Sequence, residues 1–233
     1  MDTRSAEDKQ SLIARSYLFN QVPEWQLKGL AQYAKVKSYK KREVVFRRGD
    51  LGTQMYFIVR GSVSLTTDSD EGKELTFGLL GPGDIFGEIA MLDGGERTAT
   101  VKTIESSELL VIEKRDFVPF LEKNPKVAIS LLSTIASRVR KADELCEDNF
   151  FKNLPNRLAK RFLGLADNYG RETETGVEIG MKLSQGDIGK LAGASRESIN
   201  KQLKAWEEDG LISVENGYIT IREVERMEDL CDA

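Results

Sequence analysis

The chain has 233 residues, a length that suits two domains better than one. With 40% hydrophobic and 31% charged residues it resembles an ordinary globular protein, and no run of about 18 apolar residues predicts a membrane span. The segment Met1–Lys9 is polar and lacks the apolar core of a secretion signal, so we expect a cytoplasmic protein that does not contact a membrane. The net charge of −4 does not exclude nucleic-acid binding, because the field of one face decides that.

Histidine is absent, and the two cysteines, Cys146 and Cys231, lie far apart without a CxxC motif. We therefore expect reduced thiols rather than a disulfide framework or a structural zinc site. Without histidine the chain lacks the commonest zinc and haem ligand and the commonest general base, which disfavours metalloenzymes and hydrolytic triads. The sequence thus predicts no catalytic residues and no metal site.

Short apolar runs separated by glycines fill the region from Val36 to Ile112. They are rich in β-branched and aromatic residues, a pattern typical of an antiparallel sandwich or barrel with many strands. The runs are Val44–Phe46, Met55–Val59, Val63–Leu65, Leu75–Phe77 and Leu109–Ile112. This region is the predicted sensor barrel.

A long helix is predicted from Asn124-Pro125 to about Phe150, because asparagine caps helices and proline is tolerated in the first turn. Its apolar residues recur at alternating steps of four and three, the spacing of a coiled-coil seam. They are Ala128, Leu132, Ile135, Val139, Ala142 and Cys146. We favour a dimerisation helix, and packing of the helix on its own domain is the alternative. Asn153-Leu154-Pro155 then predicts a hinge, since the residue before proline is pushed out of helical space.

The C-terminal third predicts a winged helix-turn-helix. A helix from Asn156 to about Asn168 and a polar loop to Gly180 precede a helix that Ser184 caps and that ends at Ala192-Gly193. Ser195 caps a second helix that runs to about Asp209, and two short helices about a glycine-containing turn are typical of this motif. Asn216-Gly217 between two apolar runs then predicts a hairpin, the wing.

These elements predict an α+β fold. Its parts are an N-terminal antiparallel β-barrel resembling a jelly roll, a long dimerisation helix and a C-terminal winged helix-turn-helix. The expected domain boundaries are 1–123, 124–152 and 153–233.

The densest motif runs from Phe86 to Val101 and holds a Gly-Glu pair, a glycine-rich turn and an Arg-Thr pair. Glycine lets backbone amides approach an anion, a carboxylate can accept from a ribose hydroxyl, and arginine binds phosphate oxygens in a fork. Together these groups fit a nucleotide monophosphate.

This motif resembles the phosphate-binding cassette of cyclic-nucleotide-binding domains. With the helix and winged helix that follow, nearly the whole chain resembles the cyclic AMP receptor protein/FNR family of regulators. The resemblance implies that Glu88 binds the ribose 2′-hydroxyl and Arg97 the cyclic phosphate, aided by the Thr98 hydroxyl. The cradle would be completed by Gly87, by the amides of Ile89, Ala90 and Ala99, and by the helix residues Arg138, Ala142 and Asp143, which would meet the purine and the partner subunit.

The ligand stays open between cyclic AMP and cyclic GMP. Where the cyclic AMP receptor protein has serine beside the phosphate arginine and threonine-serine on the helix, this chain has Thr98 and Ala142-Asp143. Threonine there resembles the cyclic-GMP-binding kinases and channels, and an ionised aspartate accepts hydrogen bonds of the kind that guanine donates. Asp143 as a solvated surface charge is the alternative. Iron–sulfur sensors need a cysteine cluster and haem sensors a histidine, so neither group is expected.

The second helix of the helix-turn-helix motif is the expected DNA reader. A helix fits the major groove, where arginine pairs with guanine and glutamate accepts from the cytosine amine. Arg196-Glu197 resembles the family's base-reading pair, while Lys201 stands where the cyclic AMP receptor protein has a second arginine. The expected DNA-binding set is Ser184, Ser195, Arg196, Glu197, Asn200, Lys201 and Lys204.

The resemblance implies a homodimer that binds a pseudo-palindromic site in double-stranded DNA under allosteric control, with RNA polymerase as a further partner. Two alternatives differ in class. One is a regulator of the same family whose barrel no longer binds a ligand. The other is a cyclic-nucleotide phosphodiesterase, which the absence of a histidine–aspartate metal cluster disfavours.

Overall fold

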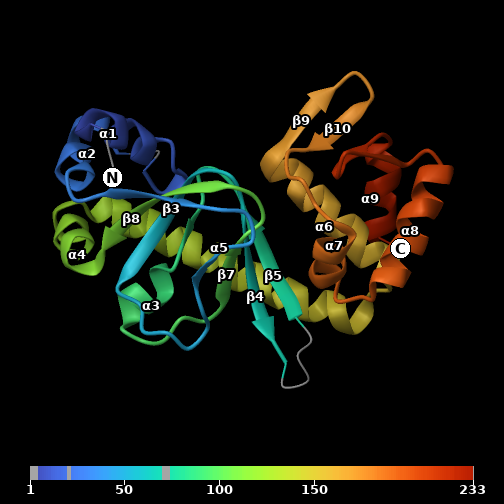
Figure 1. Ribbon diagram of the computed structural model, residues 1–233, viewed down its shortest axis with the longest axis horizontal. Helices are drawn as coiled ribbons and strands as arrows, with labels where there is room; N and C mark the ends of the chain where they lie inside the picture. Colours follow the sequence, from blue (N-terminus) through green and yellow to red (C-terminus); the bar gives the residue numbers. More distant parts are fainter. Residues whose placement is uncertain (1–4, 20–21, 70–73, 233) are drawn as a thin grey trace. The chain divides into compact units, whose positions relative to one another are not determined.

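The computed structural model describes residues 5–19, 22–69 and 74–232, without the side chains of Tyr17 and Asp232 (Figure 1). Contacts between residues divide the chain into two compact units. The first unit comprises the described parts of residues 1–67 and 79–141, and the second comprises those of residues 68–78 and 142–233.

Two four-stranded sheets form a barrel of the jelly-roll kind, as predicted. Their strand orders are β1-β8-β3-β6 and β2-β7-β4-β5. The strands are β1 (Lys35–Tyr39), β2 (Val44–Phe46), β3 (Gln54–Arg60), β4 (Val63–Asp68), β5 (Glu74–Leu80), β6 (Ile85–Phe86), β7 (Thr100–Thr103) and β8 (Ser107–Glu113). All five apolar runs predicted as strands lie in this set.

An aromatic cluster fills the barrel. Tyr56 stacks on Phe86 with ring centroids 4.9 Å apart, and Phe46 packs against both rings. Val101 and Leu109 close the same core. Phe86 ends β6 and is the first residue of the predicted phosphate-binding motif, so the cluster joins this motif to the barrel core.

Several short helices of the first unit were not predicted. They are α1 (Ala6–Ala14), the 3-10 helix η1 (Tyr17–Phe19), α2 (Glu24–Ala31), α3 (Glu88–Asp93) and α4 (Lys114–Lys123). Ser5 and Asp8 cap α1 reciprocally, and Leu27 and Leu30 of α2 are buried in the core. Pro119 lies inside α4, where it removes a backbone hydrogen bond and hides the helical pattern in the sequence.

The long helix α5 (Pro125–Phe151) begins at the predicted proline and spans 27 residues. Its N-terminal half packs Val127 and Leu131 into the core of the first unit. No helix in the described ranges is both long enough and apolar enough to span a bilayer.

The structure corrects part of the predicted seam on α5. Ile135 packs against the core of the first unit and not in an exposed stripe, because its position follows the buried pair Val127 and Leu131 at helical spacing. Leu132 and Val139 of the predicted seam are exposed, at 65% and 55% of their possible area, and so are Ile129 at 64% and, at the helix end, Phe150 and Phe151. We call Ile129, Leu132, Val139 and Phe150 the α5 stripe.

The second unit is a winged helix (Figure 1). Its elements are α6 (Leu154–Tyr169), β9 (Gly170–Thr173), β10 (Gly176–Ile179), α7 (Gln185–Ala192), α8 (Arg196–Glu208), β11 (Ile212–Glu215), β12 (Tyr218–Ile221) and α9 (Val224–Asp232). The predicted helices and the Asn216-Gly217 hairpin are confirmed, and both turn residues have positive φ. The predicted polar loop up to Gly180 is wrong: it forms the hairpin β9–β10. This hairpin lacks apolar alternation and is held by pairing of β10 with β12, which local sequence does not reveal.

Candidate ligand and DNA sites

The predicted phosphate-binding motif forms a strand, a tight turn and a short helix. Gly87 has φ 79° and joins β6 to α3, a backbone conformation that glycine adopts without steric cost. Gly87 has no side chain that could cap α3, so in the described structure the first amides of this helix have no side-chain acceptor. Ile89 and Ala90 supply two of these amides. The turn therefore presents backbone donors of the kind that bind anions.

Arg97 is buried beside this turn. Its Nη1 donates to the Gly87 carbonyl oxygen at 2.6 Å, and the guanidinium lies over the Phe46 ring at 4.1 Å from the centroid. Nε of Arg97 is buried without a hydrogen-bond partner in the described structure. Burial lowers the pKa of Arg97, with Tyr56 and Glu88 opposing the shift. The site thus holds a desolvated cation with a donor unused.

Two glycines make room for this guanidinium. A Cβ at Gly52 would lie 2.4 Å from Arg97 Nε, and one at Gly87 would lie 2.6 Å from Nη1. In the sequence, Gly52 stands out only as one of the glycines that separate the apolar runs. Because it lies far from Arg97 in sequence, only the fold reveals that it shapes the site.

Glu88 is fully buried and is joined to the long helix. Its Oε1 accepts a hydrogen bond from Nη1 of Arg138, a residue of α5. The Nη2 of Arg138 donates to the carbonyl oxygen of Ile85. Oε2 of Glu88 is buried without a partner in the described structure. A buried carboxylate oxygen in that state is costly unless a donor reaches it, and a ligand hydroxyl can do so.

The remaining predicted residues fall into two groups. Thr98 is exposed and Ala99 buried, both between Arg97 and β7. Ala142 and Asp143 are exposed on α5 and belong to the second unit. Glu88, Arg97 and Arg138 are therefore brought together within the first unit.

The helix-turn-helix has the predicted capping. Ser184 accepts from the Asp187 amide at 3.2 Å and donates to the Asp187 carboxylate at 2.6 Å. The turn after α7 contains Gly193 with φ 61°, and Ser195 then accepts from the Ser198 amide at 3.1 Å. Both capping hydroxyls are thus engaged with backbone at the start of their helices.

Helix α8 has one buried and one exposed face. Ile199, Leu203 and Trp206 are buried, and Trp206 packs edge-on against Phe162 of α6. The opposite face holds the predicted base-reading and phosphate-contacting residues, all of which are exposed: Arg196, Glu197, Asn200, Lys201 and Lys204. This face can enter a groove because the buried side fixes the helix to the rest of the unit.

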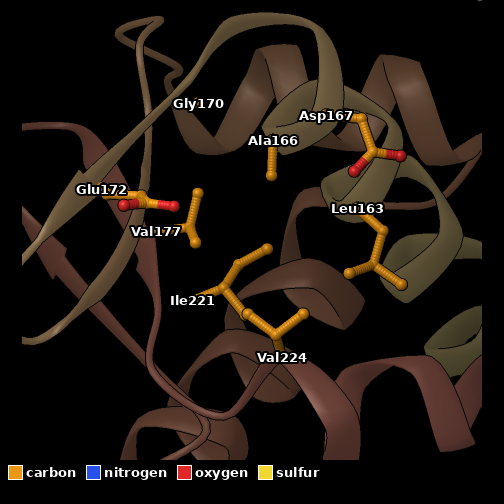
Figure 2. Close-up of a pocket in the computed structure, with 8 residues that line it drawn as sticks. All are labelled: Leu163, Ala166, Asp167, Gly170, Glu172, Val177, Ile221 and Val224. Atoms are coloured by element: carbon orange, nitrogen blue, oxygen red, sulfur yellow. The ribbon is translucent and has the colours of Figure 1, made fainter.

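A separate hollow of about 260 Å³ lies in the second unit between α6, β10, β12 and α9 (Figure 2). Its lining is mostly apolar, with two carboxylates, Asp167 and Glu172, and none of the eight described lining residues is cationic. A phosphate would be repelled there. The hollow is not a second nucleotide site by this chemistry.

No group of three or more acidic, cysteine or histidine side chains in the described ranges is arranged to hold a metal ion.

Comparison with known proteins agrees with this arrangement. The cyclic nucleotide-binding domain family matches residues 36–124, and the Crp-like helix-turn-helix domain family matches residues 156–230. The cyclic AMP receptor protein of Thermus thermophilus is 32% identical over 198 residues, covering 85% of this chain and 88% of that protein. A CRP-like cAMP-activated global transcriptional regulator of Mycobacterium tuberculosis is 28% identical over 216 residues, covering 93% and 96%.

Among solved structures, FixK2 from Bradyrhizobium japonicum has the same fold, with a TM-score of 0.77 over 86% of this chain and 98% of that one at 20% identity. The Crp-like helix-turn-helix family and the relative from Mycobacterium tuberculosis point to transcription regulation. The chain belongs to the cyclic AMP receptor protein/FNR family of DNA-binding transcription regulators, with a cyclic nucleotide-binding domain before a Crp-like helix-turn-helix.

Proposed function

We propose that this chain is a homodimeric regulator whose DNA affinity is set by cyclic AMP or cyclic GMP. The observation that carries the proposal is the pair of buried unpartnered atoms, Glu88 Oε2 and Arg97 Nε, on either side of the Gly87 turn. Glu88 would accept from the ribose 2′-hydroxyl and Arg97 would fork onto the cyclic phosphate. Nucleotide binding is assigned to residues 1–123, dimerisation to 124–152 and DNA reading to 153–233.

The proposed allosteric route starts at Glu88. Arg138 binds the same carboxylate that would meet the ribose, so ligand binding changes the environment of an α5 side chain. A ligand shifts an equilibrium only by its differential affinity for the two states, and coupling of about 1–3 kcal/mol is typical. The two states would differ in the arrangement of α5 in the dimer.

A second copy of this chain is the proposed partner of the α5 stripe. Ile129 and Leu132 lie three residues apart and Val139 one heptad after Leu132, which fits the seam of a coiled coil, and large exposed apolar residues on one helix face favour association. Asp143 and Cys146 occupy the same heptad positions as Ile129 and Leu132, two repeats further along α5. A two-fold dimer would place two α8 helices on a pseudo-palindromic DNA site, with RNA polymerase as the partner in activation.

The names of the relatives support cyclic AMP, because both matched proteins are named for it. Thr98 and Asp143 support cyclic GMP, since threonine at this position resembles the cyclic-GMP-binding kinases and channels and an ionised aspartate can accept the hydrogen bonds that guanine donates. Equilibrium dialysis of the pure protein with each nucleotide tests the proposal, followed by titration of labelled DNA with and without the bound one. Absence of binding by both nucleotides would favour the regulator with a barrel that no longer binds a ligand. Recovery of hydrolysed nucleotide would favour the phosphodiesterase.

Gly52→Ala is expected to weaken nucleotide binding by about tenfold. The new Cβ displaces Arg97 from its place beside Gly87, and overpacking a filled site costs about 1–3 kcal/mol. Calorimetry measures the change. Gly29→Ala on α2 is the matched control, because nothing lies within 4 Å of its new Cβ. Equal affinities of the two variants would mean that the guanidinium position is not critical.

Asp143→Ala is expected to weaken cyclic GMP more than cyclic AMP, by about tenfold or more in the ratio, because a hydrogen bond to a charged group contributes about 1.5–3 kcal/mol. Competition dialysis with both nucleotides reads the selectivity. Glu147→Gln, an exposed acidic residue of the same helix, is the control. An equal loss for the two ligands, or no loss, would reduce Asp143 to a surface charge.

A further inference from the structure

Asp148 is a buried carboxylate near the C-terminal end of α5, with 2% of its surface exposed. Its Oδ1 accepts from Lys160 Nζ on α6 at 3.0 Å, and Arg161 Nη2 lies 3.8 Å from Oδ2. Lys160 also lies 3.7 Å from Glu144, one turn earlier on α5. All four residues belong to the second unit. Two adjacent cations of α6, Lys160 and Arg161, thus form ion pairs with carboxylates in the last turns of α5.

The aromatic residues at the end of α5 do not pack into this joint. Phe150 and Phe151, the last two residues of α5, are 83% and 86% exposed. Buried ion pairs add little net stability compared with apolar contacts, but removing one partner is strongly destabilising, and such pairs can select one arrangement over others. What Asp148 can select here is the direction in which α6 leaves α5.

Hydrogen bonds also fix the segment that connects α5 to α6. The Lys152 amide donates to the Asp148 carbonyl at 3.0 Å, and Asn153 caps α6 by accepting from the Asn156 amide. Arg157 then donates to the Lys152 carbonyl at 2.9 Å and to the Ala192 carbonyl at 3.2 Å. Ala192 ends α7, the first helix of the DNA-binding motif, so the fixation extends from α5 to that motif.

Electrostatics within the group are consistent with this role. Burial lowers the pKa of Arg161, while Asp148 and Glu144 oppose that shift and Arg157 adds to it. The carboxylates of α5 therefore offset part of the desolvation of a partly buried guanidinium on α6.

We propose that Asp148 is a positioning residue that latches the winged helix to the end of α5. Because of this latch, the DNA-binding motif turns with the helix and not about Asn153-Leu154-Pro155, where the sequence predicts a hinge. Along α5, Arg138 is bound to Glu88 in the first unit and Asp148, about three turns later, is bound to Lys160 in the second. The role of Asp148 in signal transmission rests on the proposed response to a cyclic nucleotide. The latch itself does not depend on that response.

Asp148→Asn tests the latch in the full-length protein. Hydrogen exchange of the free protein is expected to be about tenfold faster at the Lys152 and Arg157 amides, because local opening of the joint becomes easier. Glu147→Gln, the neighbouring exposed acid, is the matched control and is expected to leave exchange unchanged. Unchanged exchange in folded Asp148→Asn would overturn the latch.

The same variant tests transmission. The cyclic nucleotide dissociation constant is expected to stay within about twofold of the wild type, while the ratio of DNA affinities with and without nucleotide falls below about threefold, from a typical range of about 5–150-fold. An unchanged ratio would overturn the positioning role. A third outcome is that hydrogen exchange is faster in Asp148→Asn but the wild-type protein responds to neither nucleotide. This outcome would support the latch and refute the proposed function.

Lys160→Met keeps the test decisive if Asp148→Asn does not fold. Lys160 is 33% exposed, so its removal leaves less uncompensated charge in the interior, and it breaks the same ion pair from the α6 side. The same faster exchange and the same loss of the affinity ratio are expected. Normal exchange and a normal ratio in this variant would contradict the proposal.

Discussion

Arg97→Ala is expected to abolish measurable binding of cyclic AMP and cyclic GMP. A buried phosphate that loses its arginine fork is left without its charged partner, an effect on the order of 2–5 kcal/mol. The structure adds that no second cation replaces it in the immediate contacts described for the turn: Arg138 is already bound to Glu88 and to the Ile85 carbonyl. Isothermal titration calorimetry with each nucleotide measures the loss.

The variant is expected to remain folded, which separates lost binding from lost structure. Burial lowers the pKa of Arg97, so its positive charge opposes folding at neutral pH in the ligand-free protein, and removing that charge offsets part of the lost packing on Phe46. Arg97→Lys retains a charge without the fork and is expected to bind more weakly than the wild type but more tightly than the alanine variant. Arg115→Ala, which removes an arginine whose side chain is 80% exposed, is the control. Full affinity in folded Arg97→Ala would mean that the motif is not the phosphate site.

The sequence predicts the elements whose signals are local. Alternating apolar runs identify five barrel strands, and the predicted caps Ser184 and Ser195 each accept a backbone hydrogen bond where a helix begins. Asn216-Gly217 determines its hairpin because both residues tolerate positive φ. These features depend on a few neighbouring residues, so they can be predicted from a single sequence without an alignment.

Features that depend on tertiary contacts are not predictable in this way. Periodicity alone cannot tell that Ile135 faces the core of the first unit while Ile129 is exposed, since both lie on apolar positions of one helix. Gly52 shapes the surroundings of Arg97 across the barrel, and Asp148 meets Lys160 only because α6 folds back beside α5. The spacing of Glu88 and Arg97 was visible in the sequence. The ion pair of Glu88 with Arg138 was not predicted, because no local pattern links the two residues and the resemblance placed Arg138 beside the purine and the partner subunit.

Arg196→Ala is expected to weaken specific DNA binding by about 1–3 kcal/mol per half-site and to relax the base preference at one symmetric position. Arg196 is the first residue of α8 and is exposed, with Nε 3.4 Å from the Gln185 side chain of α7. Side chains in the first turn of a recognition helix point at base edges in this docking geometry. Binding of the nucleotide-loaded protein to a randomised operator pool reads the base preference directly.

Lys204→Ala is the matched comparison on the same face. Lys204 lies more than two turns further along α8 and is 78% exposed, 3.6 Å from Glu208, where a contact to the DNA backbone is expected. Its removal should lower affinity uniformly over all sequences and reduce the slope of log affinity against log salt by about 1, because one phosphate contact is lost. The Arg196→Ala variant could still discriminate fully between an operator and its mismatched variants while nucleotide still drives binding. That result would show that α8 does not read the bases. In that case the wing β11–β12 or the start of α7 would have to carry the specificity, and Lys204→Ala would then be expected to have no effect on the salt slope.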